Sequence, residues 1–137
     1  MNKVERDPAQ CRILRQADRR FLEDIKRFGD KRQRMHDRSV EIRRELSGMR
    51  TDLRRLQAME AAAGALGAAG KVISAGAVDL SLGVRVSVLQ GRIDEREMAL
   101  AAAKADVANL RYQIETAQRE HGKNAERLDA LNCVRDS

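Results

Sequence analysis

The chain has 137 residues, of which 35% are charged and only 2% are aromatic, and its formal net charge at pH 7 is +6. Tryptophan is absent, and the aromatic residues are Phe21, Phe28 and Tyr112. This composition argues against an ordinary globular domain and is typical of a coiled coil or a long helix. Intrinsic disorder is the competing interpretation of so charged a chain.

The first helix is expected over residues 8–60. Asp7 followed by Pro8 is a favourable helix start, because an aspartate can cap the first turn and a proline suits the first helical position. Residues 1–8 are polar, and we expect them to be disordered ahead of this start.

Large apolar residues recur at every seventh position of the first helix. They are Leu14, Phe21, Phe28, Met35, Ile42, Met49 and Leu56. A strict seven-residue repeat stays in register only when two helices wind around each other, and these residues take the d positions of such a coiled coil. The a positions are Cys11, Asp18, Ile25, Arg32, Ser39, Leu46 and Leu53. We expect the seam to be continuous from Leu46 to Leu56 and weaker toward the N-terminus, where polar residues interrupt it.

Residues 61–80 are rich in alanine and glycine and separate two apolar repeats. Glycine occupies positions 64, 67, 70 and 76, and each glycine weakens a helix by about 1 kcal/mol relative to alanine. We therefore expect this segment to be the tip of an antiparallel hairpin, with the reversal between Gly67 and Gly76. A single continuous helix that dimerises in parallel is the alternative.

The apolar repeat returns in residues 81–132, where we expect the second helix. Its a positions are Val86, Ile93, Leu100, Val107, Ile114, His121 and Leu128. Its d positions are Leu89, Arg96, Ala103, Leu110, Ala117, Asn124 and Leu131. Because the last of these positions are small or polar, we expect this end of the hairpin to splay, with residues 133–137 as a tail. The predicted fold class is all-α, an antiparallel two-helix coiled-coil hairpin.

The two cysteines, Cys11 and Cys133, lie near opposite ends of the chain, and a hairpin would bring those ends together. The heptad phase argues against a disulfide, because Cys11 lies on the seam whereas Cys133 lies two residues past Leu131 and would point outward. The N-terminus also lacks the apolar core of a signal peptide, and disulfides are rare in reducing compartments. We therefore expect two reduced thiols in a cytoplasmic protein.

The sequence offers no convincing chemical site. Residues 64–71 superficially resemble a phosphate-binding loop, but positions 65 and 72 carry alanine and valine where that loop needs glycine and a hydroxyl residue. His36 and His121 lack the short paired spacings of metal sites; we expect the first to be solvated and the second to set the helix register. Two packed helices also provide no concave, water-excluding pocket in which the pKa values of carboxylates could be shifted for catalysis. We expect no enzymatic activity, no cofactor, no metal and no small-molecule substrate.

Basic residues gather on the first helix. Residues 12–55 contain 15 basic and 8 acidic side chains, whereas residues 85–137 contain 9 of each. Several fall on adjoining b and c positions that face away from the second helix. This basic stripe comprises Arg12, Arg19, Arg20, Lys26, Arg27, Arg34, Arg54 and Arg55. One interpretation is a solvated face with pairs such as Glu23–Arg27 and Asp30–Arg34, and the other is a docking surface for an acidic partner, either protein or nucleic acid.

Two alternative functions follow from these features. A basic coiled coil could bind nucleic acid with a strong salt dependence, although few aromatic side chains are available to stack on bases. A secreted or translocator-like coiled coil could contact a membrane with its tip, since Lys71 is the only charge in residues 61–78. That lysine would cost about 2.5–3.5 kcal/mol inside a bilayer.

Two charged stretches carry a resemblance to a known family: EIRRELSGMRTDLRRL at residues 41–56 and LQGRI at residues 89–93. With its length and hairpin plan, the chain over residues 14–131 resembles the central stalk family of type III secretion ATPases. This family includes the YscO and InvI proteins of injectisomes and the flagellar FliJ. The Ala/Gly-rich tip departs from family members whose tips are more polar and aromatic.

The resemblance implies a role in protein transport and virulence. Such a protein is a cytoplasmic stalk or adaptor that docks in the central pore of the hexameric export ATPase. It stands at the inner-membrane face of the secretion apparatus and links the ATPase to the export-gate protein. Secretion chaperones are further implied partners. The resemblance assigns no individual binding residue.

Overall fold

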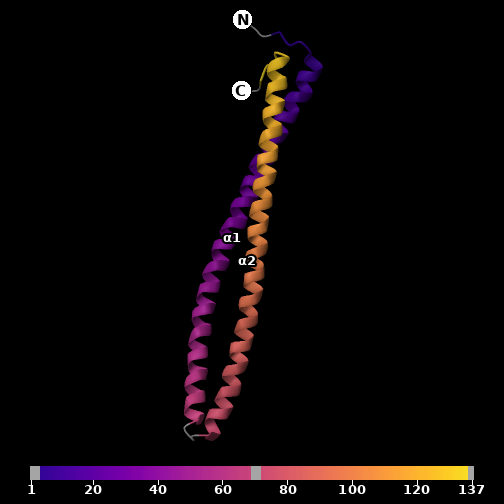
Figure 1. Cartoon of the computed structure of the whole chain (residues 1–137). Coiled ribbons are helices and arrows are strands. Elements are labelled where there is room, and N and C mark those ends of the chain that lie inside the picture. Colours follow the sequence, from indigo (N-terminus) through magenta and orange to yellow (C-terminus); the bar gives the residue numbers. More distant parts are fainter. Residues whose placement is uncertain (1–3, 69–71, 136–137) are drawn as a thin grey trace. The chain divides into compact units, whose positions relative to one another are not determined.

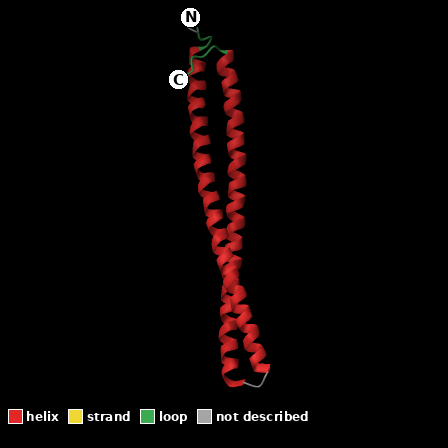
Figure 2. Cartoon of the chain, turned by 90° about the vertical axis from the view of Figure 1, so that its left-hand side faces the viewer, coloured by secondary structure: helices red, strands yellow, loops and turns green. Residues whose placement is uncertain are grey.

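The computed structural model describes residues 4–68 and 72–135, apart from the side chains of residues 65–80. Helix α1 runs over Pro8–Ala68 and helix α2 over Val72–Ala130. The helices run in opposite directions (Figure 1), and the described residues contain no strand (Figure 2). The prediction of an all-α helical hairpin is confirmed.

Both helices extend into the segment that was expected to form the tip. Helix α1 continues past Glu60 to Ala68, and α2 already begins at Val72. Alanine has the highest helix propensity and surrounds the glycines here, so each local glycine penalty is too small to end a helix that is already formed. The reversal expected between Gly67 and Gly76 involves residues 69–71, which lie outside the described residues.

The predicted start of α1 is confirmed in detail. The backbone amide of Gln10 donates a hydrogen bond to Oδ1 of Asp7 at 3.1 Å. The amide of Cys11 donates to the carbonyl oxygen of Asp7 at 2.9 Å, which is the first bond of the helix. Asp7 is thus the N-cap and Pro8 occupies the first helical position, where its missing amide hydrogen costs nothing.

The chain divides into two compact units, each built from a stretch of both helices. The terminal unit comprises residues 1–36 and 105–137, and the central unit comprises residues 37–104. With the exception of Cys133, the buried side chains among the described residues all lie at a or d positions of the two repeats. They are Cys11, Leu14, Ser39, Ile42, Leu46, Leu82, Ile93, Ala103, Leu110, Ala117, Asn124 and Leu128. The heptad assignment is therefore correct along both helices.

The central unit has an aliphatic core. Ile42, Leu46 and Ile93 are buried together. Partly buried neighbours pack against them, and these are Met49, Leu53, Leu89, Ala99 and Leu100. Two ion pairs connect the helices beside this core, Arg50 with Glu97 at 2.9 Å and Arg96 with Glu45 at 3.1 Å. The continuous seam predicted from Leu46 to Leu56 is present as far as Leu53, and Leu56 is half-buried beyond this core.

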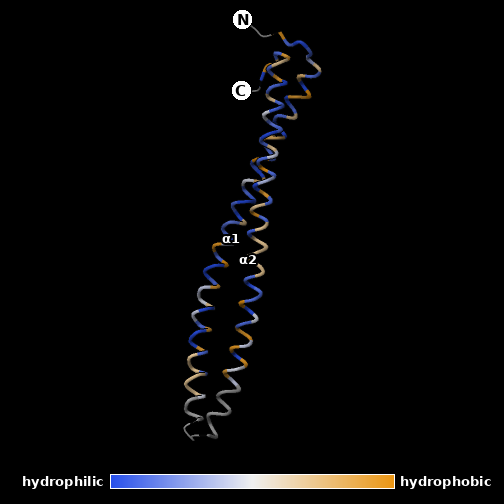
Figure 3. The backbone as a smooth tube through the Cα atoms, viewed as in Figure 1, coloured by the Kyte–Doolittle hydropathy of each residue, from blue (hydrophilic) through white to orange (hydrophobic). Residues whose placement is uncertain are grey.

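The terminal unit has a smaller core at the end of the chain. Cys11, Leu14, Leu128 and Cys133 are buried together, and Leu131 packs against them. Hydrophilic stretches alternate with apolar positions along both helices (Figure 3). On α1 the residues between Leu14 and the end of this unit are exposed or half-buried. The predicted weakness of the seam toward the N-terminus is therefore present, although the helices pack again around Cys11 and Leu14 at the start of α1.

Candidate functional site

The basic stripe lies on the surface of α1, as its b and c positions predict. In the terminal unit its members are all exposed, and they are Arg12, Arg19, Arg20, Lys26, Arg27 and Arg34. The guanidinium of Arg27 pairs with Asp24 at 2.9 Å and lies 5.2 Å from the ring centroid of Phe28. Arg27 therefore pairs with a residue three positions away, rather than with Glu23 as expected.

A shallow hollow lies within this part of the stripe. It has a volume of about 290 Å³ and is lined by Gln16, Arg19, Arg20 and Glu23. Two guanidiniums on its border can donate hydrogen bonds to an incoming carboxylate, and arginine does so in a forked geometry that lysine cannot match. The hollow therefore offers an acidic side chain a pair of donors, with the carboxylate of Glu23 on the same border.

The remaining members of the stripe, Arg54 and Arg55, belong to the central unit and are also exposed. Nη2 of Arg54 donates a hydrogen bond to Oγ1 of Thr51 at 3.4 Å. Arg55 lines a groove that α2 completes. The stripe is thus shared between two units.

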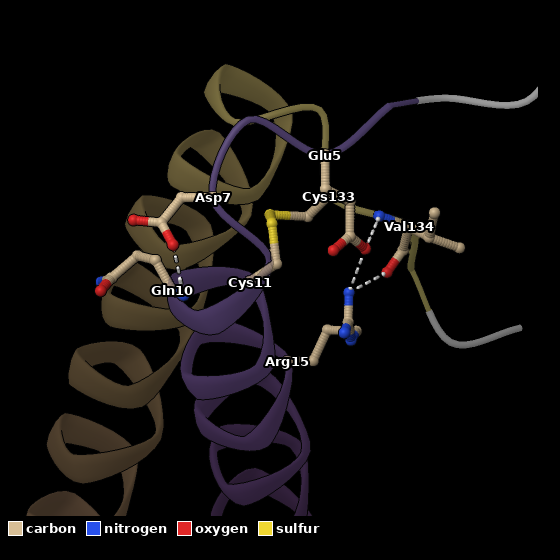
Figure 4. A network of polar contacts seen from close by, with 7 residues as sticks. All are labelled: Glu5, Asp7, Gln10, Cys11, Arg15, Cys133 and Val134. Atoms are coloured by element: carbon tan, nitrogen blue, oxygen red, sulfur yellow. Dashed lines mark hydrogen bonds and ion pairs between the residues drawn. A yellow bond between two sulfur atoms is a disulfide. The ribbon is translucent and has the colours of Figure 1, made fainter.

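A disulfide joins Cys11 near the start of α1 to Cys133 just after the end of α2 (Figure 4). Their Cα atoms are 5.5 Å apart, although the residues are 122 positions apart in the sequence. The expectation of two reduced thiols is therefore wrong. It assumed that the heptad phase continues to Cys133, whereas α2 ends at Ala130.

The end of α2 turns Cys133 back toward the core. Asn132 has a positive φ of 52°. Its amide donates to the carbonyl oxygen of Asp129 at 3.1 Å, and the amide of Cys133 donates to the carbonyl oxygen of Leu128 at 2.9 Å. These bonds form a Schellman motif, which also brings Cys133 onto Leu128. Asparagine tolerates this left-handed conformation better than most residues, so Asn132 was the available sequence signal.

Polar contacts around the disulfide tie the two ends together (Figure 4). Nη1 of Arg15 donates to Oε1 of Glu5 at 2.7 Å and to the carbonyl oxygen of Val134 at 3.1 Å. The amide of Val134 donates to the same Glu5 oxygen at 3.2 Å. Mainly because of the hydrogen bond from Arg15, and then that from Val134, the pKa of Glu5 lies below its ordinary value. We call this assembly the terminal clasp; its members are Glu5, Cys11, Arg15, Cys133 and Val134.

The clasp corrects two expectations about the chain ends. Residues 1–8 were expected to be disordered and residues 133–137 to form a tail, because both segments are polar. In the described part, the amide of Arg6 donates to the carbonyl oxygen of Leu131 at 3.0 Å. The side chain of Arg135 also donates to the last turns of α2. Polarity alone did not reveal that the two segments bind each other.

Three polar seam residues of the terminal unit, Asp18, His121 and Asn124, make contacts between the helices. Nε2 of His121 lies 2.8 Å from Oδ1 of Asp18. Nδ2 of the buried Asn124 donates to the carbonyl oxygen of Leu14 at 2.8 Å. These contacts join α1 to α2, so the end that was expected to splay is held closed. Polar pairs at a and d positions also fix which residues lie opposite each other.

The other candidate sites of the sequence concern metal, phosphate and membrane binding. Among the described residues no three or more histidine, cysteine or acidic side chains are grouped so as to hold a metal ion. His36 is exposed, as expected, and borders an open hollow of about 460 Å³. The segment 64–71, with its superficial likeness to a phosphate loop, is helical up to Ala68, and its remainder is outside the described residues. The described helices also include none with an apolar stretch long enough to cross a membrane.

No family model, curated protein or solved structure matches this chain. Function must therefore be inferred from the hairpin itself, from the exposed basic stripe and from the terminal clasp.

Proposed function

We propose that this protein is an interaction protein, namely a stalk or adaptor of a type III secretion system that docks in the central pore of the hexameric export ATPase. The observation that carries the proposal is the two-helix hairpin with an exposed basic stripe on α1. A two-helix hairpin can contact more than one partner, and its two helices carry different net charge.

The charge distribution supports a docking role for α1. Residues 12–55 carry 15 basic and 8 acidic side chains, whereas residues 85–137 carry 9 of each. An acidic pore would therefore attract one helix more than the other. Complementary charge of this kind speeds association and fixes orientation more than it adds affinity. We expect docking to weaken as the salt concentration rises.

The remaining parts of the proposal come with the family resemblance. The protein would be cytoplasmic, peripheral to the inner membrane at the secretion apparatus, and would link the ATPase to the export-gate protein and to secretion chaperones. The order of genes in the genome offers a direct check, because a stalk gene is expected beside its ATPase gene.

Charge reversal of the stripe tests the docking surface. In one variant Arg19, Arg20, Lys26 and Arg27 are replaced by glutamate. The matched control carries glutamate at exposed basic positions of α2, which are Lys104, Arg111, Arg119 and Arg127. In a pull-down with the ATPase, the stripe variant should lose binding while the control retains it. Equal retention by both variants would reject the docking surface, and circular dichroism verifies that both are helical.

A second candidate is favoured by the disulfide. Disulfides persist in oxidising environments and are rare in a reducing cytosol, so the Cys11–Cys133 bond favours a secreted or translocator-like coiled coil. The membrane contact suggested for the tip concerns residues 61–80, most of whose side chains lie outside the described residues.

The redox state in cells separates the two candidates. Thiols are trapped by rapid acid quenching and alkylation, and the mobility of the protein is compared on gels with and without reductant. Two alkylated cysteines in growing cells support the cytoplasmic stalk. An intact disulfide, together with recovery of the protein outside the cytoplasm, supports the secreted alternative.

A further inference from the structure

A groove between α1 and α2 in the central unit combines apolar and basic side chains. Its volume is about 390 Å³. It is lined by Asp52, Arg55 and Leu56 from α1 and by Val84, Arg85, Val88, Leu89 and Arg92 from α2. We call it the arginine-rimmed groove. Of the basic stripe only Arg55 takes part in it.

The apolar lining of this groove is open to water. Leu56 and Leu89 are half-buried between the helices. Val84 and Val88 lie one turn apart on α2 and are 63% and 53% exposed. Single exposed apolar residues are ordinary on protein surfaces. Two exposed valines beside two leucines in one groove form an apolar surface, and its burial by a partner would be favourable.

The charged residues that line the groove are mainly positive. Arg55, Arg85 and Arg92 are exposed, and none of the three has an ion pair or hydrogen bond with another residue that the structure describes. Asp52 is the one acidic residue in the lining. Elsewhere in this unit Arg50 and Arg96 do form ion pairs, with Glu97 and Glu45, whereas the three groove arginines are donors available to another molecule.

We propose that the arginine-rimmed groove binds an acidic amphipathic helix of a partner protein. From Val84 to Arg92 the groove follows α2 for about 12 Å at 1.5 Å per residue, which accommodates roughly two turns of a third helix. Aliphatic side chains at positions i, i+4 and i+7 of that helix reach the valines and leucines. Carboxylates on either side of them accept hydrogen bonds from the arginines.

Charge and apolarity together favour this occupant over others. A nucleic-acid backbone would use the arginines but would leave Val84 and Val88 uncovered. A second copy of the same groove would bring two sets of arginines together, and like charges at an interface are costly. An acidic amphipathic helix satisfies both the arginines and the valines.

The binding test uses a designed peptide as the probe. The peptide is a fluorescein-labelled helix with leucines at i, i+4 and i+7, glutamates on both sides of them and alanines elsewhere. A control peptide has the same composition in scrambled order, so its net charge is identical but its apolar face is lost. Fluorescence anisotropy with the full-length protein should show saturable binding of the designed peptide and much weaker binding of the control peptide.

Matched variants locate the binding site. Val84→Ser with Val88→Ser should weaken binding by about tenfold or more, because two aliphatic contacts are lost. The control pair Ile13→Ser with Leu22→Ser removes apolar residues of similar exposure, 60% and 50%, from the terminal unit and should leave binding unchanged. All four positions are exposed, so the helical fold is retained.

Charge variants complete the experiment. Arg85→Gln with Arg92→Gln should weaken peptide binding by about tenfold and flatten its salt dependence. Exposed arginines elsewhere on α2 provide the control, Arg111→Gln with Arg119→Gln, which should bind as the unmodified protein does.

Three outcomes would overturn the proposal. The first is equal binding of the designed and the scrambled peptide. The second is binding that survives the paired valine substitutions, which would indicate a purely electrostatic surface; if duplex DNA then competes equally well, nucleic acid is the preferred ligand. The third is a dimer in light scattering that disappears in the valine variant, which would assign the groove to a second copy of the chain.

Discussion

Opening the disulfide should strongly destabilise the protein. The bond closes a loop with a sequence separation of 122 residues. The chain-entropy relation gives a stabilisation of about 5 kcal/mol for a loop of this length. Since small proteins unfold with a total free energy of roughly 5–15 kcal/mol, reduction should remove a large share of the stability.

Urea unfolding of oxidised and reduced protein, followed by circular dichroism at 222 nm, measures the effect. With a slope of about 2 kcal/mol per molar urea, the midpoint should fall by roughly 2.5 M on reduction. Reduction is the cleanest perturbation because it retains both buried sulfur atoms. The double variant Cys11→Ala with Cys133→Ala is the control, since reductant should not change its midpoint.

Hydrogen exchange can show which part of the protein loses stability first when the disulfide is reduced. The amides of Cys133 and Val134, which donate within the terminal unit, should exchange faster after reduction. The reasoning is refuted if the reduced and oxidised proteins unfold at the same urea concentration. It is equally refuted if thiol titration of the protein, purified without reductant, finds two accessible cysteines after unfolding.

Further predictions concern single residues. Asp7→Ala removes the N-cap and should lower the free energy of unfolding by about 1 kcal/mol in urea. Asn124→Ala should lower it by about 1–2 kcal/mol, because a buried hydrogen bond to the Leu14 carbonyl is lost; an unchanged urea midpoint would contradict this role. Gly48→Ala should raise the melting temperature, because the added Cβ meets nothing within 4 Å and alanine gains up to about 1 kcal/mol in a helix. The lowered pKa of Glu5 means that its stabilisation is present at neutral pH and is lost as the pH falls through its lowered native pKa. Urea midpoints of the wild type and of Glu5→Gln should therefore converge in acid, and a constant difference would exclude this titration.

Much of the fold could be predicted because one physical rule governs it. A seven-residue repeat fixes which side chains face the partner helix, and Leu46 and Ile93 are buried where the repeat puts them. The helix ends were less predictable. The extension of α1 to Ala68 depends on the difference in helix propensity between alanine and glycine, which is only about 1 kcal/mol per residue.

The disulfide was not predicted because Cys133 lies beyond the end of α2. The repeat predicts directions only as far as the helix continues, and the left-handed residue Asn132 ends that regularity before Cys133. The exposure of the basic stripe followed directly from its b and c positions. The arginine-rimmed groove did not, because its lining depends on which turn of α2 faces Asp52 and Arg55, and the apolar repeat allows several such alignments.

The sulfur–sulfur bond also has a topological consequence. It converts the polypeptide between Cys11 and Cys133 into a covalent ring. A single protease cut within the ring leaves one molecule, which separates into two fragments only after a reductant is added. Such a ring can enter a narrow conduit only as two strands abreast, so the oxidised protein is unsuited to be single-file cargo until this one bond is opened.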